Sequence, residues 1–299
     1  MNEKKYSLAL DWTPNINHIG FFVANEKEFY KQNQISLEIQ SPGLDNYRYS
    51  PAKKIEMGEV DFALCPTETV MSFRTKSKPL ELSALATIFQ EDISAIAVRD
   101  EASISRPADL DGKSYASYGA RYEDLIVKQL IKNDGGEGDI TISYPERLGV
   151  WDTILNGNFD ATWIFMNWEG IEKPDFKLFK LKDYEIPYSY SPLIVSSKVL
   201  ADKNEAEIKN FLAATKEGYM YSIKNMEESV EILQKFVPEK DRKIDLFKAL
   251  QFSKDYFGNT DNFGKINRAI LLNFFEWIRE NGIEKEVIDV DELCPNFFI

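Results

Sequence analysis

The chain has 299 residues, of which 43% are hydrophobic and 28% charged, and this balance is typical of an ordinary globular protein. Its 49 acidic residues outnumber its 36 basic residues and give a net charge of −13. So acidic a chain repels the phosphate backbone of nucleic acids and anionic membrane surfaces. We therefore expect no nucleic-acid partner, and a neutral or cationic small-molecule ligand suits the charge better. The alternative is that the charge only keeps the protein soluble.

Other sequence features bear on compartment and metal binding. No apolar run reaches the roughly 18–20 residues that a membrane helix needs, so no membrane insertion is expected. The sequence after Met1 enters a strand-like segment without the apolar core of a secretory signal, which favours the cytoplasm. An extracytoplasmic location is the alternative if a signal was removed. Cys65 and Cys294 are expected to be reduced and partly buried, and the single histidine excludes a histidine-rich metal site.

Strand and helix patterns alternate along the first third of the chain. Short apolar or period-two segments predict strands, and apolar residues at helical spacing predict helices between them. The predicted strands cover 6–10, 35–39, 60–64, 80–88 and 93–98, and the predicted helices cover 20–31, 52–57 and a segment starting near 67. This order is typical of an α/β fold with a largely parallel sheet.

The alternation breaks near residues 99–106 and then starts afresh. Strands are predicted at 114–117, 140–143 and 161–165, with helices at 123–132 and 149–155. After a further strand from 193, the sequence is almost purely helical, at 205–224, 227–236, 244–254 and 266–281. We infer a discontinuous lobe of residues 1–99 and 193–299, with the helical tail packed on it, and an inserted lobe of residues 100–192. A cleft between two such lobes is a favoured place for a small ligand.

The segment Leu10-Asp-Trp-Thr-Pro-Asn-Ile-Asn-His-Ile-Gly-Phe21 leads from the end of the first strand to the start of a helix. Loops at the carboxyl ends of parallel strands are where such sheets bind ligands. The segment supplies an acid, an indole, two amides and an imidazole, namely Asp11, Trp12, Asn15, Asn17 and His18. The cluster predicts a ligand site. The alternative is that Asn17 or His18 caps the helix and Trp12 belongs to the core.

A second cluster follows the predicted strand 161–165. It contains Phe165, Asn167 and Glu169 within Trp163-Ile-Phe-Met-Asn-Trp-Glu-Gly170. A buried acid that accepts paired N–H donors from a heterocycle makes a strong and specific contact. The alternative for Glu169 is a solvent-exposed position at the rim of the sheet.

A third stretch, Cys65-Pro-Thr-Glu-Thr69, leads from a buried strand into a helix. Thr67 and Glu68 are therefore candidate ligand contacts, although a simple helix cap explains them better. Known catalytic and cofactor motifs are missing. Gly135-Gly-Glu-Gly138 follows a helix and not a strand, which is the wrong context for a phosphate loop. We expect no cofactor and no catalytic residue.

The motifs also carry a family resemblance. Asp11-Trp-Thr-Pro-Asn-Ile-Asn-His18 resembles the N-terminal signature of the thiamine-precursor-binding proteins of ABC transporters and of the yeast-type pyrimidine synthase. The similarity continues through Gly58-Glu-Val-Asp-Phe-Ala63, Pro107-Ala-Asp-Leu-Asp-Gly-Lys113, Asn156-Gly-Asn-Phe-Asp-Ala161 and Asn167-Trp-Glu-Gly170. It covers most of the chain and implies a type II periplasmic-binding-protein fold.

In the transporter branch of this family, the resemblance implies that aromatic residues stack on a formyl-aminopyrimidine and that the acid of the Asn-x-Glu-Gly motif binds it. That role would fall on Glu169, with Trp12, Asn15 and Phe165 lining the site. The transporter branch often has a tyrosine where Phe165 stands, so one hydroxyl contact is lost. A transporter partner is expected only if the protein is exported.

The synthase branch makes its pyrimidine from pyridoxal phosphate and a sacrificed histidine, with iron. The resemblance places its lysine and histidine just after the Gly-x-Val-Asp strand, where this sequence has Cys65 and Thr69. Its cysteine cluster is also missing, because Ile186-Pro-Tyr-Ser-Tyr-Ser-Pro192 stands there. Two hypotheses remain. The first is a non-catalytic binder of a small heterocycle, which the resemblance implies is an aminopyrimidine precursor of thiamine. The second is an enzyme of thiamine or vitamin B6 metabolism that uses His18 or Glu68.

Overall fold

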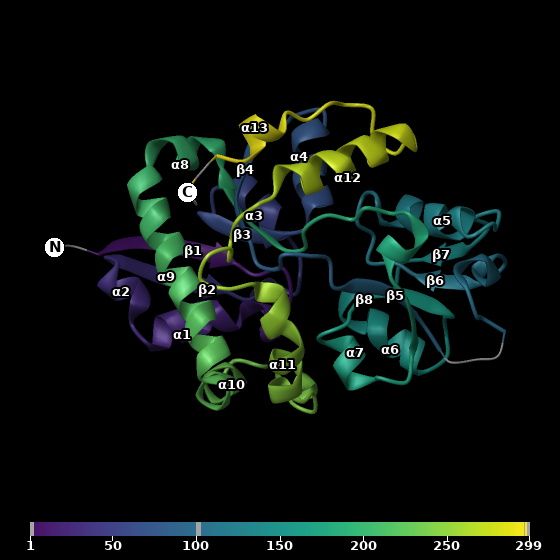
Figure 1. Cartoon of the computed structure of the whole chain (residues 1–299), viewed down its shortest axis with the longest axis horizontal. Coiled ribbons are helices and arrows are strands. Elements are labelled where there is room, and N and C mark those ends of the chain that lie inside the picture. Colours follow the sequence, from purple (N-terminus) through teal and green to yellow (C-terminus); the bar gives the residue numbers. More distant parts are fainter. Residues whose placement is uncertain (1–2, 100–102, 296, 298–299) are drawn as a thin grey trace. The chain divides into compact units, whose positions relative to one another are not determined.

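The computed structural model describes residues 3–99, 103–295 and 297 (Figure 1). Its contacts divide the chain into two compact units. The first contains Met1–Asp92, Tyr190–Leu271 and Ile288–Ile299, and the second contains Ile93–Ser189 and Leu272–Val287. Each unit has one five-stranded sheet with helices packed against it, so the predicted α/β class is confirmed. None of the helices within the described ranges is long and apolar enough to span a membrane.

The sheet of the first unit has the order β2-β1-β3-β10-β4. Its strands are β1 (Lys4–Ala9), β2 (Ile35–Gln40), β3 (Phe62–Cys65), β4 (Leu82–Thr87) and β10 (Leu193–Ser197). β1 pairs in parallel with both β2 and β3, whereas β10 is antiparallel to β3 and β4. The sheet is therefore mixed. The sequence predicted each strand but not the direction of β10, because a short strand buried on both faces reads the same either way.

Helices cover this sheet and include most of the predicted tail (Figure 1). They are α1 (Ile19–Glu26), α2 (Phe29–Gln32), α3 (Pro51–Met57), α4 (Thr67–Thr75), α8 (Lys198–Lys203), α9 (Glu205–Lys224), α10 (Met226–Gln234), α11 (Leu246–Phe257) and α13 (Val290–Leu293). The helix predicted over 20–31 is broken in two, because Glu28 adopts a left-handed backbone with φ 59°. Phe211 of α9 stacks on Phe62 of β3 at 4.1 Å, which fixes the long helix to the sheet.

The sheet of the second unit has the order β7-β6-β8-β5-β9. Its strands are β5 (Ser94–Val98), β6 (Ser114–Ala116), β7 (Thr141–Ser143), β8 (Ala161–Phe165) and β9 (Lys177–Phe179). β6, β7 and β8 are parallel, and β5 runs antiparallel to β8 and β9. Ser94–Val98 lies in this sheet, although the sequence analysis placed it before the lobe boundary at residue 99. All five of its residues are buried, so its sequence does not indicate which sheet it joins.

The helices of the second unit are α5 (Glu123–Asn133), α6 (Val150–Leu155) and α7 (Glu169–Glu172). The helical tail is divided between the units. α9, α10 and α11 lie in the first unit, whereas residues 272–287, which include most of α12 (Arg268–Glu280), are grouped with the second.

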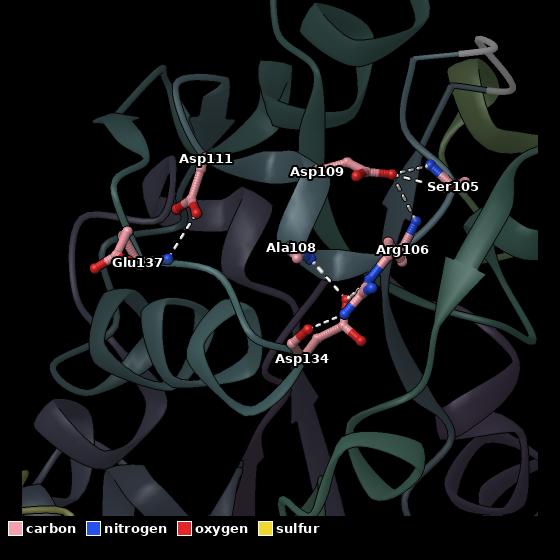
Figure 2. A network of polar contacts seen from close by, with 7 residues as sticks. All are labelled: Ser105, Arg106, Ala108, Asp109, Asp111, Asp134 and Glu137. Atoms are coloured by element: carbon pink, nitrogen blue, oxygen red, sulfur yellow. Dashed lines mark hydrogen bonds and ion pairs between the residues drawn. The ribbon is translucent and has the colours of Figure 1, made fainter.

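A network of carboxylates fixes the loops around the end of α5 (Figure 2). Asp134 accepts hydrogen bonds from Arg106 Nε at 2.7 Å and from the Ala108 N–H at 2.8 Å. The Arg106 guanidinium and this N–H lower the pKa of Asp134. Asp111 accepts the Glu137 N–H at 2.6 Å. The glycine-rich stretch after α5 is thus held by structural contacts, and within the described ranges no group of three potential metal ligands is placed to hold an ion.

Two glycines allow α1 and α9 to approach closely. A Cβ atom at Gly218 of α9 would lie 2.1 Å from the carbonyl oxygen of Gly20 and 2.9 Å from Ala24 Cβ. A Cβ at Gly20 would lie 2.0 Å from the ring of Tyr219. Only hydrogen fits at either position, so this contact sets the spacing between α1 and α9.

We expect Gly218→Ala to lower the free energy of unfolding by about 1–3 kcal/mol, because the added methyl group overpacks the contact. Chemical denaturation measures this difference. Gly149→Ala is the matched control, since a Cβ there meets no atom within 4 Å. Equal stability of Gly218→Ala and the wild type would show that the helices separate without cost.

Candidate functional site

The carboxyl ends of three parallel strands meet at one edge of the first sheet. Asp11 and Trp12 follow β1, and Thr67 and Glu68 follow β3. β10 is antiparallel, so its amino end, preceded by Tyr190, reaches the same edge. The structure therefore brings the first and third predicted clusters to one place. This edge is where α/β sheets place ligand sites.

His18 is fully buried and fastens the first cluster into one unit. Its Nε2 lies 2.8 Å from Asp11 Oδ1, and its Nδ1 accepts the backbone N–H of Asn15 at 3.2 Å. Because Nδ1 accepts, the ring proton is on Nε2 and is donated to the Asp11 carboxylate. Both ring nitrogens are therefore engaged in holding the loop.

Asn15 and Asn17 have structural hydrogen bonds as well. Asn15 Oδ1 accepts the Asn17 N–H at 2.8 Å and so caps the short 3₁₀ turn Ile16–His18, while His18 completes the capping box. The carbonyl oxygen of Asn17 accepts the Tyr219 hydroxyl at 2.5 Å. Both asparagines are buried. The expected cap at Asn17 is therefore wrong, because Asn15 is the N-cap and Asn17 supplies the capped N–H, whereas His18 does take part in the capping box. The segment is a rigid, hydrogen-bonded loop.

We expect His18→Ala to lower the free energy of unfolding by about 2–4 kcal/mol, because it leaves a cavity and an unpaired buried N–H. Urea denaturation measures this loss. Tyr219→Phe removes one hydrogen bond to the same segment and no ring, so we expect about 1 kcal/mol there. A loss for His18→Ala no larger than that for Tyr219→Phe would contradict the fastening role of the imidazole.

Trp12 packs against Tyr47, a residue that the sequence analysis missed. The ring centroids are 5.1 Å apart and the ring planes meet at 61°, an edge-to-face arrangement. The Tyr47 hydroxyl also accepts the backbone N–H of Thr13 at 2.9 Å. Tyr47 lies in the loop after β2, and β2 is parallel to β1. The strand-end rule that selected Asp11 would have selected this loop too.

Thr67 and Glu68 are both buried at the start of α4. The Thr67 N–H and hydroxyl both donate to the Tyr190 carbonyl oxygen, at 3.0 Å and 2.9 Å. Thr67 thus ties β3 to the entry of β10 and has no further donor for a ligand. Burial raises the pKa of the Cys65 thiol, and the negative charges of Asp11 and Glu68 raise it further. The thiol therefore stays protonated.

The second predicted cluster follows β8 in the second unit. Glu169 is buried with 7% of its surface exposed, and its Oε2 accepts the backbone N–H of Phe165 at 3.0 Å. Asn167 is fully buried. The alternative of a solvent-exposed glutamate at the rim is wrong. The cluster is a compact turn in which a buried carboxylate is oriented by the strand that precedes it.

The sequence analysis also missed the loop between β6 and α5. Glu123, at the first position of α5, is buried and accepts the Tyr115 hydroxyl at 2.7 Å. It also accepts the N–H groups of Tyr118 and Ala120, at 3.1 Å and 3.3 Å. One carboxylate thus shapes the turn around Gly119, which has φ 73°. β6 is parallel to β8, so this turn lies at the same edge of the second sheet as the Glu169 cluster.

Burial raises the pKa of Glu123, although its hydrogen bonds oppose the shift. A carboxyl group with a raised folded-state pKa favours folding most at pH values below its unfolded pKa of about 4.3. That contribution is lost as the pH rises through the folded-state pKa. We expect the wild type to lose stability relative to Glu123→Gln as the pH rises above about 4.3, measured by urea denaturation. Identical pH profiles for wild type and Glu123→Gln would contradict the prediction.

The fold has many solved counterparts. An alkanesulfonate-binding protein from Xanthomonas axonopodis pv. citri superimposes with a TM-score of 0.72 over 98% of this chain and 99% of its own, at 11% identity. A Candida albicans protein described as having the generic periplasmic-binding-protein fold gives 0.69 over 98% and 96%, at 14% identity. The expected periplasmic-binding-protein fold is confirmed. Other counterparts include a ligand-binding component of an ABC-type import system from Staphylococcus aureus and a periplasmic aliphatic sulphonate-binding protein from Escherichia coli.

Sequence relatives point to a narrower group. The formylaminopyrimidine-binding protein of Halalkalibacterium halodurans is 22% identical over 231 residues, which are 76% of this chain and 68% of that protein. The 4-amino-5-hydroxymethyl-2-methylpyrimidine phosphate synthase of Legionella pneumophila is 21% identical over 244 residues, or 79% of this chain and 75% of that protein. The model of the family described as "NMT1/THI5 like" matches residues 15–229. The chain therefore belongs to the NMT1/THI5-like family.

Proposed function

We propose that this protein binds an aminopyrimidine precursor of thiamine, or a closely similar small heterocycle, and does not transform it. The observation that carries the proposal is that both ring nitrogens of His18 are occupied by hydrogen bonds within the protein. Its two nitrogens hold Asp11 and the Asn15 N–H, so the segment that resembles the family signature is a rigid support for Trp12. A relative named for binding a formylaminopyrimidine supports the choice of ligand. Trp12 would stack on the heterocycle, and the buried Glu169 would accept its N–H groups.

The residues speak against the synthase reaction, although one relative is named as such an enzyme. The resemblance places the synthase's lysine and histidine where this chain has Cys65 and Thr69. Cys65 is buried with its pKa raised, so its thiol is a poor nucleophile. Without a lysine, pyridoxal phosphate has no amine to bond to at this position, and without the histidine there is no nitrogen donor.

We expect Glu169→Gln to weaken binding of the formylaminopyrimidine by about 1.5–3 kcal/mol, because a charged acceptor is replaced by a neutral amide. Isothermal titration calorimetry measures the change. Glu172→Gln is the matched control, since Glu172 lies in the same short helix and accepts Trp151 Nε1 at 3.0 Å. Unchanged affinity of Glu169→Gln would remove Glu169 from the site.

Trp12→Ala tests the other edge in the same assay. The loss of base stacking should weaken binding by about 1–3 kcal/mol. The binding proposal would be wrong if the wild type showed neither a heat of binding nor a thermal shift with any thiamine-pathway pyrimidine.

A second candidate function is an enzyme that uses Glu68 or His18 as its acid–base group. The observation that favours it is the burial of Glu68 at the start of α4, near the Cys65 thiol, whose pKa its negative charge raises. Mass spectrometry of wild-type incubations with thiamine and vitamin B6 precursors tests it. Turnover that is lost in His18→Ala or Glu68→Gln supports the enzyme, whereas recovery of unchanged compounds supports the binder.

We propose a cytoplasmic location, with export and an ABC transporter partner as the alternative. Two buried, unpaired cysteines are compatible with a reducing compartment. The importer components among the structural counterparts support the alternative. Cell fractionation with an antibody against the protein distinguishes the two, because an exported binding protein is released with the periplasmic or surface fraction.

A further inference from the structure

The loop after β2 has a strained backbone beside Trp12. Asn46 and Tyr47 are consecutive residues in the left-handed region, with φ values of 53° and 59°. A bulky residue such as tyrosine rarely adopts this conformation, because its Cβ lies too close to the backbone there. Such strain persists only where surrounding contacts hold the residue in place. The position of Tyr47 is therefore maintained by specific interactions.

An ion pair between a buried lysine and a partly exposed aspartate supplies one of these interactions. Lys54 of α3 has only 5% of its surface exposed, and its Nζ lies 2.8 Å from Asp45 Oδ2. The other oxygen, Asp45 Oδ1, is buried and accepts no hydrogen bond from any described residue. Lys54 therefore provides the main compensation for this carboxylate, and its loss would leave a charge that favours moving the loop into water.

The ion pair and Tyr47 belong to one short segment. Asp45 ends the 3₁₀ turn Pro42–Asp45, and the Tyr47 N–H donates to the Pro42 carbonyl oxygen at 2.9 Å. Only Asn46 separates Asp45 from Tyr47, so a displacement of Asp45 must move Tyr47. Tyr47 in turn contacts two successive residues of the signature segment, the ring of Trp12 and the N–H of Thr13. A buried charge on α3 is thus connected through the loop to the orientation of the indole.

We propose that Tyr47 is a specificity-determining residue of the binding site, and that Asp45 and Lys54 are positioning residues that act through it. This inference rests on the proposed function. The Tyr47 ring fixes the plane of the Trp12 indole, so the site is prepared for a flat aromatic ligand before that ligand arrives. Because the orientation is set in advance, a planar ring binds without the entropy cost of ordering the indole.

Two measurements test the proposal. The first is ¹⁹F NMR of protein labelled with 5-fluorotryptophan, in which Trp12→Phe assigns the Trp12 resonance among the five tryptophans. We expect one sharp Trp12 resonance in the wild type and a shifted or broadened one in Tyr47→Ala and Lys54→Met. The second is calorimetry with the formylaminopyrimidine, where we expect both variants to bind about 3- to 10-fold more weakly.

Neighbouring residues provide matched controls. Tyr49→Ala removes a tyrosine from the same loop whose ring contacts Arg48. Lys53→Met removes a lysine from the same helix that pairs with Glu56 on the surface. Both controls should retain the wild-type resonance and affinity. If Lys54→Met fails to fold, Asp45→Asn/Lys54→Met removes both charges and leaves no uncompensated carboxylate.

The outcomes separate this inference from the proposed function. A wild-type Trp12 resonance and full affinity in Tyr47→Ala would overturn the role of Tyr47, even if the ligand binds well. Wild-type behaviour of Lys54→Met and of the double variant would overturn the positioning role of the ion pair. If no ligand binds to the wild type, the proposed function fails, and a displaced Trp12 resonance in Tyr47→Ala would still support the restraint on the indole.

Discussion

The buried imidazole of His18 is the interaction on which the candidate site depends. A neutral imidazole has one N–H donor and one nitrogen acceptor. Here the Nε2 donor faces Asp11, and the Nδ1 acceptor faces the Asn15 N–H. The ring therefore joins the end of β1 to the start of the turn before α1. A flexible loop at this point would present Trp12 in many orientations, and ligand binding would then have to select one of them.

Other elements fix the same segment from different directions. Tyr219 of α9 binds the Asn17 carbonyl, and Tyr47 binds the Thr13 N–H. The close contact of Gly20 with Gly218 lets α9 approach near enough for the first of these bonds. The helical tail and the signature segment 11–18 are therefore coupled through the contact between α1 and α9.

Hydrophobic periodicity was sufficient to predict most strands and helices of both units. The period does not encode strand direction or sheet membership, which is why β10 and Ser94–Val98 departed from expectation. The strand-end rule located Asp11, Trp12 and Glu169 at sheet edges. It did not predict that both ring nitrogens of His18 are hydrogen-bonded within the loop. A histidine near the start of a helix can be a capping residue or a catalytic residue, and the sequence around it does not distinguish the two. Tyr47 was missed since its loop contains no motif, although the same rule applies to it.

The polar groups at the two sheet edges favour binding a ligand over transforming it. Catalysis needs a group whose proton or electron pair is available at the moment of reaction. At the first edge His18 donates a hydrogen bond to Asp11, and the Thr67 hydroxyl donates one to the Tyr190 carbonyl oxygen. Burial keeps the Cys65 thiol protonated. At the second edge Glu123 and Glu169 accept backbone N–H groups. These hydrogen bonds fix the shape of each loop, and the site gains rigidity from bonds that also occupy the His18 and Thr67 donors.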